Sequence, residues 1–136
     1  MNAVGAFPAY RPRRLRQHPG LRRLVAETTL DPARLVAPVF TAAGVKKRSP
    51  VASMPGGHRL SGAETVAEAK LLSKLGVGGI LIFGIPAKKD AQGTGAYAAD
   101  GIVQQAVNAV KRAAPGLIVM TDVCLCEYTA HGHCGV

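Results

Sequence analysis

Three short apolar runs, separated by two segments with helical periodicity, restrict the possible fold of this chain more than any other feature. The runs are L-V-A-P-V-F at 35–40, G-I-L-I-F at 79–83 and L-I-V-M at 117–120, and the last continues into Asp122. Continuous apolar runs of this length are typical of strands that are buried on both faces of a parallel sheet. We therefore predict three buried strands.

The segment after residue 60 has the start, the periodicity and the stop of a helix. Ser61 and Glu64 have the spacing of a capping box, and Gly76 suits a left-handed helix end. The apolar stripe between them consists of Val66, Ala69, Leu72 and Leu75. Residues 41–60, rich in Gly, Pro and Lys, are predicted to form a loop.

A second helix is predicted between Asp100, as its N-cap, and Pro115. Lys111 and Arg112 would lie at its negative end. The inward positions of this helix are Ile102, Val103, Ala106, Val107 and Val110.

Alternating strands and helices form the β-α-β-α-β pattern of a parallel sheet with right-handed crossovers. The pattern fits an open doubly wound sheet or an eightfold barrel, and an open sheet would leave residues 117–122 as an apolar edge. We therefore predict an α/β fold, the first three strand-helix units of a TIM (β/α)8 barrel at 34–136. An extended N-terminal arm would occupy 1–33. Because a barrel has about 250 residues, we expect the remaining strands beyond Val136.

The formal net charge of +9 lies mainly in the leading segment, since residues 1–48 carry ten Lys or Arg and only two acids. A nucleic-acid-binding surface would interleave aromatic residues with these charges, and only Tyr10 lies near the arginines. We predict no nucleic-acid partner and interpret the arm as a contact between subunits of a homo-oligomer.

The compartment is predicted to be the reducing cytoplasm. Three cysteines cannot all pair within one chain, and the N-terminus lacks the basic and apolar regions of a signal peptide. No apolar run approaches the length of about 18 residues needed for a membrane span.

The stretch T-D-V-C-L-C-E-Y-T-A-H-G-H-C-G at 121–135 holds all three cysteines. In an extended segment Asp122, Cys124 and Cys126 would point to one side, and a turn at Gly132 could return Cys134 as a third sulfur. Zinc prefers such a tetrahedral N/S environment, and three protein ligands leave its fourth position open. A catalytic Zn²⁺ site is therefore predicted at the end of the third strand.

Three other interpretations of the cysteines remain open. They could form a closed Cys3His structural site with His131 or His133, or be free cysteines of the core, or act as a redox C-x-C pair. Nearby, Gly93 and Gly95 satisfy the dinucleotide pattern G-x-G-x-x-A, but they follow the second strand too late, which favours an active-site loop.

Several stretches resemble the porphobilinogen synthase, or delta-aminolevulinic acid dehydratase, family in order along the chain. Besides residues 121–135 these are R-P-R-R-L-R, E-T-T-L-D-P-A-R-L-V-A-P-V-F, S-M-P-G-G-H-R-L-S, F-G-I-P-A-K-K-D-A-Q-G-T-G and D-G-I-V-Q-Q-A. The resemblance implies a barrel enzyme that condenses two molecules of 5-aminolevulinate to porphobilinogen, with loss of two waters, in heme biosynthesis.

The resemblance also implies roles for individual residues. Cys124, Cys126 and Cys134 match the ligands of a catalytic Zn²⁺, which places the chain among the zinc-dependent members rather than those with acidic ligands. Asp122 matches the carboxylate that faces the substrate amino group, and His133 is a candidate neighbour of the site.

No position matches the two lysines that form Schiff bases with substrate in later strands of the family. Lys88 and Lys89 are interpreted as a solvated loop pair rather than as substitutes for them. We therefore expect this chain alone to be inactive. The alternative function is a non-catalytic zinc-binding or nucleic-acid-binding module.

Overall fold

The computed structural model describes residues 5, 7, 8, 10, 11 and 13–135, so parts of the predicted arm lie outside the described residues. The chain divides into two compact units, Met1–Leu30 and Asp31–Val136. None of the described helices is long and apolar enough to cross a membrane.

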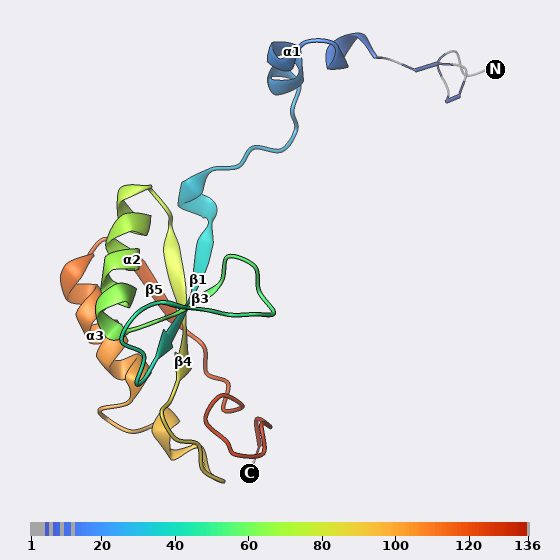
Figure 1. The fold of residues 1–136 in the computed structure, drawn as a ribbon. Coiled ribbons are helices and arrows are strands. Elements are labelled where there is room, and N and C mark those ends of the chain that lie inside the picture. Colours follow the sequence, from blue (N-terminus) through green and yellow to red (C-terminus); the bar gives the residue numbers. More distant parts are fainter. Residues whose placement is uncertain (1–4, 6, 9, 12, 136) are drawn as a thin grey trace. The chain divides into compact units, whose positions relative to one another are not determined.

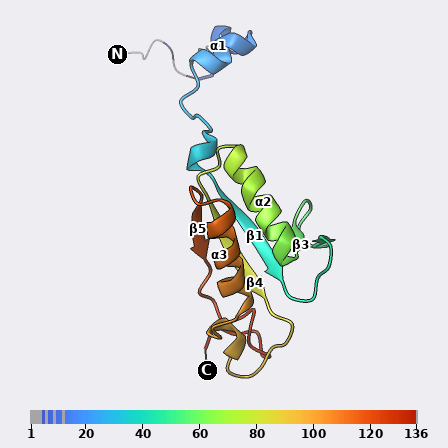
Figure 2. The same ribbon diagram turned by 90° about the vertical axis from the view of Figure 1, so that its left-hand side faces the viewer.

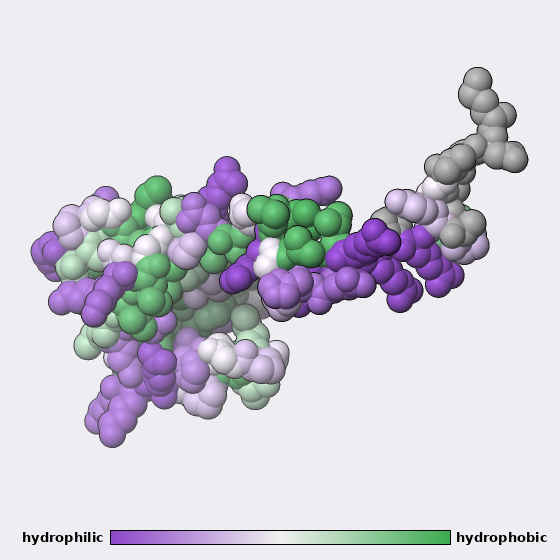
Figure 3. All heavy atoms as spheres, turned by 90° about the horizontal axis from the view of Figure 1, so that it is seen from above, coloured by the Kyte–Doolittle hydropathy of each residue, from purple (hydrophilic) through white to green (hydrophobic). Residues whose placement is uncertain are grey.

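The first unit contains two short helical segments, η1 (Arg14–Arg16) and α1 (Pro19–Leu24). His18 precedes α1, and its Nδ1 accepts a hydrogen bond from the Gly20 backbone N–H at 3.1 Å. The surface of this unit carries hydrophilic side chains next to an apolar patch (Figure 3), and neither helix has a buried side chain.

The second unit is a five-stranded sheet in the order β2-β3-β1-β4-β5, with two helices (Figure 1). Its elements are η2 (Pro32–Arg34), β1 (Val36–Ala42), β2 (Ser49–Pro50), β3 (His58–Leu60), α2 (Gly62–Lys74), β4 (Gly79–Ile85), η3 (Thr94–Ala96), α3 (Ile102–Ala113) and β5 (Ile118–Thr121). Strands β1, β4 and β5 are parallel neighbours, and α2 and α3 cover the same face of the sheet (Figure 2). The three predicted strands and two predicted helices are all present.

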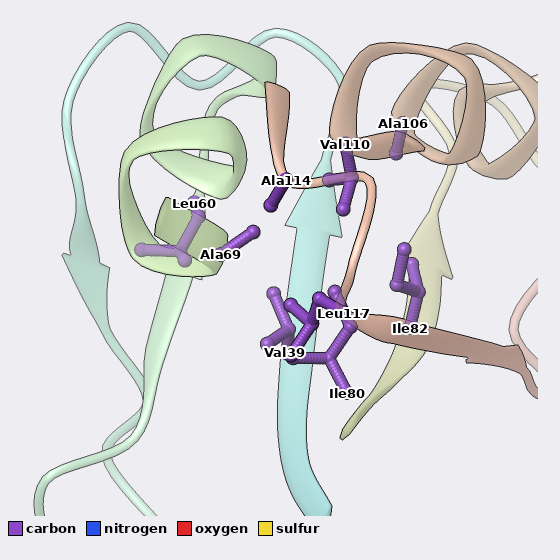
Figure 4. Close-up of a cluster of buried hydrophobic side chains, with 9 residues drawn as sticks. All are labelled: Val39, Leu60, Ala69, Ile80, Ile82, Ala106, Val110, Ala114 and Leu117. Atoms are coloured by element: carbon purple, nitrogen blue, oxygen red, sulfur yellow. The ribbon is translucent and has the colours of Figure 1, made fainter. Parts of the chain in front are cut away.

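The core lies between the two helices and the sheet (Figure 4). Ile80 and Ile82 of β4 and Val110 of α3 are fully buried. The other members of the cluster are Val39, Leu60, Ala69, Ala106, Ala114 and Leu117. Alternate residues of β4 are buried, as expected for a strand with one covered face, and the buried residues of α3 are among its predicted inward positions.

Helix α2 begins and ends as predicted. The Ser61 hydroxyl accepts from the Glu64 N–H, and the Glu64 carboxylate accepts from the Ser61 N–H. Gly76 follows the helix with a φ of +77°, a conformation that suits glycine. Ala69 is buried, whereas Leu75 at the helix end is 60% exposed and lies outside the core.

Two predictions about local structure are wrong. Residues 41–60 are not only loop, because β2 and β3 form a small hairpin and β3 pairs in parallel with β1. The hairpin has little apolar pattern because β2 and β3 are only two and three residues long, and β3 pairs with β1 at Arg59 and Leu60. Asp100 does not cap α3 with its side chain, because Gly101 is the N-cap and has no side chain to donate or accept.

The strands are also not buried on both faces in this chain. On β1, Val36 is 49% exposed, and on β5, Ile118 is 62% exposed. The helices cover only one face of the sheet, so the side chains that alternate with the core residues remain accessible. Phe40 and Phe83 stack on each other on this second face, with ring centroids 5.2 Å apart.

Candidate metal centre

The cysteine segment begins where β5 leaves the sheet. The Asp122 N–H still donates to the Ile82 carbonyl at 3.1 Å, so the ladder continues one residue beyond the strand. After that the chain turns, because the Leu125 carbonyl accepts from the N–H groups of both Tyr128 and Thr129. The predicted extended geometry is therefore wrong for Cys126, which lies in the turn.

The turn nevertheless brings the three sulfurs together. Cys124 Sγ lies 2.8 Å from Cys126 Sγ and 2.8 Å from Cys134 Sγ. The return of Cys134 occurs through Gly132, whose φ is +74°. Cys124 and Cys126 are half-buried and Cys134 is exposed, so these residues do not behave as free cysteines of the core.

Contacts between the sulfurs shift the pKa values of the Cys124 and Cys126 thiols in opposite directions. The side chains of Cys126 and then Cys134, acting as donors to Cys124, lower the pKa of the Cys124 thiol. The same contact with Cys124, followed by desolvation and by Glu127, raises the pKa of Cys126 to about 12. Of these two thiols Cys124 is therefore the more acidic, with Cys126 as a donor to it.

A second group of potential ligand atoms shares Cys124 with the first. It combines the carboxylates of Asp122 and Glu127 with the Cys124 sulfur, all within 4.8 Å of one another. Glu127 was not among the predicted site residues, although it directly follows Cys126 in the sequence. A pocket of about 240 Å³ borders Asp122 and Cys124 and is lined also by Gln104 of α3.

The two histidines lie beside the cysteines but not among them. Neither of the two potential ligand groups found in the described residues includes a histidine nitrogen. The ring of His133 stacks on that of His131 with centroids 5.8 Å apart, and His131 Nε2 lies 3.3 Å from the Ala91 carbonyl. This arrangement does not favour the closed Cys3His alternative.

Gly95 leaves room for the Tyr128 side chain of the cysteine segment, because a Cβ at Gly95 would lie 3.3 Å from the Tyr128 ring. Gly93 has a backbone role instead, since its φ is +63° and a Cβ there would make only an ordinary contact with Tyr128. Gly84 on β4 closes this socket, since a Cβ there would overlap the Tyr128 hydroxyl. Gly93 and Gly95 therefore have a backbone role and a packing role respectively, and Tyr128, only 6% exposed, anchors the turn.

Lys88 and Lys89 are both exposed, as expected for a loop pair. Lys89 Nζ donates to the Cys126 carbonyl at 3.4 Å. This contact places a positive charge beside the cysteine segment, a role that the sequence alone did not indicate.

Comparison with known proteins finds related sequences over nearly the whole chain. A model of the delta-aminolevulinic acid dehydratase family matches residues 9–136. Curated relatives with that name include one from Synechococcus elongatus, 53% identical over 129 residues, which are 95% of this chain and 40% of the relative. One from Streptomyces coelicolor is 47% identical over 140 residues, covering 100% of this chain and 42% of the relative. The chain thus spans about two fifths of the length of these relatives.

A solved structure has the same arrangement of elements. It is a delta-aminolevulinic acid dehydratase (porphobilinogen synthase) of Toxoplasma gondii ME49 in complex with the reaction product porphobilinogen. The TM-score is 0.81 with 32% sequence identity, over 93% of this chain and 36% of that chain.

Proposed function

Because this chain belongs to the delta-aminolevulinic acid dehydratase family, we propose that it supplies the zinc-binding side of a porphobilinogen synthase active site. The proposed reaction is the condensation of two 5-aminolevulinate molecules to porphobilinogen with loss of two waters. The observation that carries the proposal is the convergence of Cys126 and Cys134 on Cys124.

The donor set suits Zn²⁺. Three thiolates without a histidine form an incomplete tetrahedral shell, which is typical of a catalytic rather than a structural zinc. With Zn–S bonds of about 2.3 Å, tetrahedral sulfurs are about 3.8 Å apart. The side chains, with sulfurs 2.8 Å apart, therefore need to separate by about 1 Å. Cys126 lies in a turn and Cys134 is exposed, which permits that adjustment.

Zn²⁺ bound there would supply Lewis-acid chemistry at its open position. The role of this chain's own residues is to bind and orient. The Asp122 carboxylate lies within 4.8 Å of the Cys124 sulfur and borders the pocket, so it can accept a hydrogen bond from a substrate ammonium group. His133 would be a neighbour of the metal rather than a ligand.

We further propose that β1, β4 and β5 are the first three strands of a TIM (β/α)8 barrel. Consecutive parallel neighbours with helices on one face are the repeating unit of that fold. The exposed face with Phe40 and Phe83 would then line the barrel interior, and the cysteines would lie at the carboxyl ends of the strands. The Schiff-base lysines would come from later strands, and 136 residues alone would not form porphobilinogen.

In the complete enzyme we propose that the N-terminal arm, residues 1–33, contacts other subunits of a homo-oligomer in the cytoplasm. A nucleic-acid-binding role for the arginines of the first unit is the alternative. It predicts an affinity for nucleic acid that falls steeply with salt, as expected for several phosphate contacts.

The proposed site can be tested by metal binding to the reduced 136-residue chain. We expect one Zn²⁺ per chain, loss of binding in Cys124→Ser and Cys134→Ser, and retained binding in His131→Ala and His133→Ala. The bound metal can be replaced by Co²⁺, whose thiolate charge-transfer bands report sulfur ligation. Addition of 5-aminolevulinate should change the cobalt spectrum, because one position is open.

Two results would contradict the proposal. A chain that is folded and reduced but binds no Zn²⁺ would leave the cysteines without a metal role. Loss of Zn²⁺ in either histidine variant, with a cobalt spectrum unaffected by 5-aminolevulinate, would instead identify a closed structural site.

A further inference from the structure

The loop that follows β4 lies against the cysteine segment, and both are at the same end of the sheet (Figure 1). The Asp90 N–H donates to the Tyr128 carbonyl at 3.2 Å, and the Asp90 carbonyl accepts from the Ala130 N–H at 2.8 Å. These two bonds form a parallel bridge between Asp90 and Thr129. The turn between Cys126 and Cys134 is thus hydrogen-bonded to one residue of a different loop.

The Asp90 side chain holds its own loop in shape. Its carboxylate accepts from the N–H groups of Gln92 and Thr94 at 2.9 and 3.1 Å, and also from the Thr94 hydroxyl. An aspartate that bonds the backbone two residues ahead is a common way to stabilise a turn. Here the turn presents the Asp90 backbone to the cysteine segment.

Thr129 links the bridge with Asp90 to the residue that precedes Cys134. Its side chain is 1% exposed, and its hydroxyl donates to the His133 carbonyl at 3.0 Å. His133 is the residue directly before Cys134, so the position of the last cysteine depends on Thr129. Tyr128, on the other side of Thr129, is held in its socket of glycines.

We propose that Asp90 is a positioning residue for the metal centre: its carboxylate fixes the loop whose backbone holds Thr129 and so places Cys134 beside Cys124. The inference rests on the proposed zinc site for its functional meaning, but the contact it describes exists without the metal. Asp90 touches neither the sulfurs nor the pocket, so it acts only through the turn.

The first test measures amide hydrogen exchange in the metal-free 136-residue chain. We expect the Ala130 N–H to exchange at least about tenfold faster in Asp90→Ala than in the unmodified chain, because its acceptor is no longer fixed. Thr94→Val should show the same direction of change, whereas Thr94→Ser keeps the hydroxyl and should match the unmodified chain. Asp100→Asn is the control, since no hydrogen bond of its carboxylate is present among the described residues.

The second test measures Zn²⁺ affinity and the Co²⁺ spectrum of the same variants. Loss of a residue that orients metal ligands typically weakens binding about tenfold to a hundredfold. We expect that range for Asp90→Ala, with weaker thiolate charge transfer as Cys134 moves away, and no change for Thr94→Ser or Asp100→Asn.

The outcomes separate the two proposals. If the unmodified chain binds no Zn²⁺, the proposed function fails, and Ala130 exchange alone decides the role of Asp90. Unchanged Ala130 exchange in Asp90→Ala overturns the inference, and so does Zn²⁺ binding equal to that of Asp100→Asn. If Asp90→Ala does not fold, the comparison of Thr94→Val with Thr94→Ser decides in the same way.

Discussion

Replacement of Gly84 by alanine should destabilise the second unit through the socket that holds Tyr128. A Cβ at Gly84 would overlap the Tyr128 hydroxyl and lie 2.5 Å from Val103 Cγ2. Tyr128 is buried, and Val103 packs against the core from α3. Neither side chain can turn into solvent without losing those contacts, so the strand and the turn must separate.

The expected cost follows from the number of side chains displaced. A methyl group inserted into a packed interior costs about 1–3 kcal/mol, and with two neighbours displaced we expect about 2 kcal/mol. For a unit of this size that corresponds to a fall of about 8 °C in Tm. The cysteine turn should move with Tyr128, so Zn²⁺ affinity should fall as well.

Urea denaturation of Gly84→Ala, Tyr128→Phe and the double variant provides the assay. Removal of the hydroxyl relieves one of the two overlaps, so the double variant should be more stable than the sum of the single changes predicts, by about 1 kcal/mol. Gly116→Ala is the matched control, because a Cβ there meets no atom within 4 Å. The packing explanation is refuted if Gly84→Ala is as stable as Gly116→Ala, or if the two changes are additive.

Two further predictions concern the fold. The hydrogen bond from the Ser61 backbone N–H is the main cause that lowers the pKa of Glu64 below its usual 4.5. The stabilising effect of the Glu64 carboxylate is therefore present above pH 4.5 and is lost as the pH falls through the lowered pKa. In thermal melts Glu64→Gln should be less stable than the unmodified chain at pH 7, and the difference in stability should shrink on acidification below pH 4.5. Val110→Ala should cost about 2 kcal/mol in urea denaturation, because the residue is fully buried in the core. Val123→Ala, at a position 87% exposed, should change little, and equal effects would contradict the assignment of the core.

Features set by neighbours along the chain were predictable from the sequence. The Ser61–Glu64 capping box and the glycine end of α2 depend on residues within one or two helical turns, and both are present. The strands were predictable because β1, β4 and β5 come from continuous apolar runs. The short strand β3 was not, since its pairing with β1 involves only two residue pairs.

The candidate site divides in the same way. The sequence by itself identified which residues could form the cluster, because all three cysteines of the chain lie within eleven residues. It did not determine how they meet, and the extended geometry expected for Cys126 is replaced by a turn.

Only the tertiary structure decided that turn. Tyr128 requires the space left by Gly84 on β4 and by Gly95 after it, and the Asp90 backbone bonds Tyr128 and Ala130 across about forty residues of sequence. Hydrogen bonds and packing between distant segments leave no periodicity in either segment. Local pattern therefore identifies the ligands, while contacts between two loops set the distances between them.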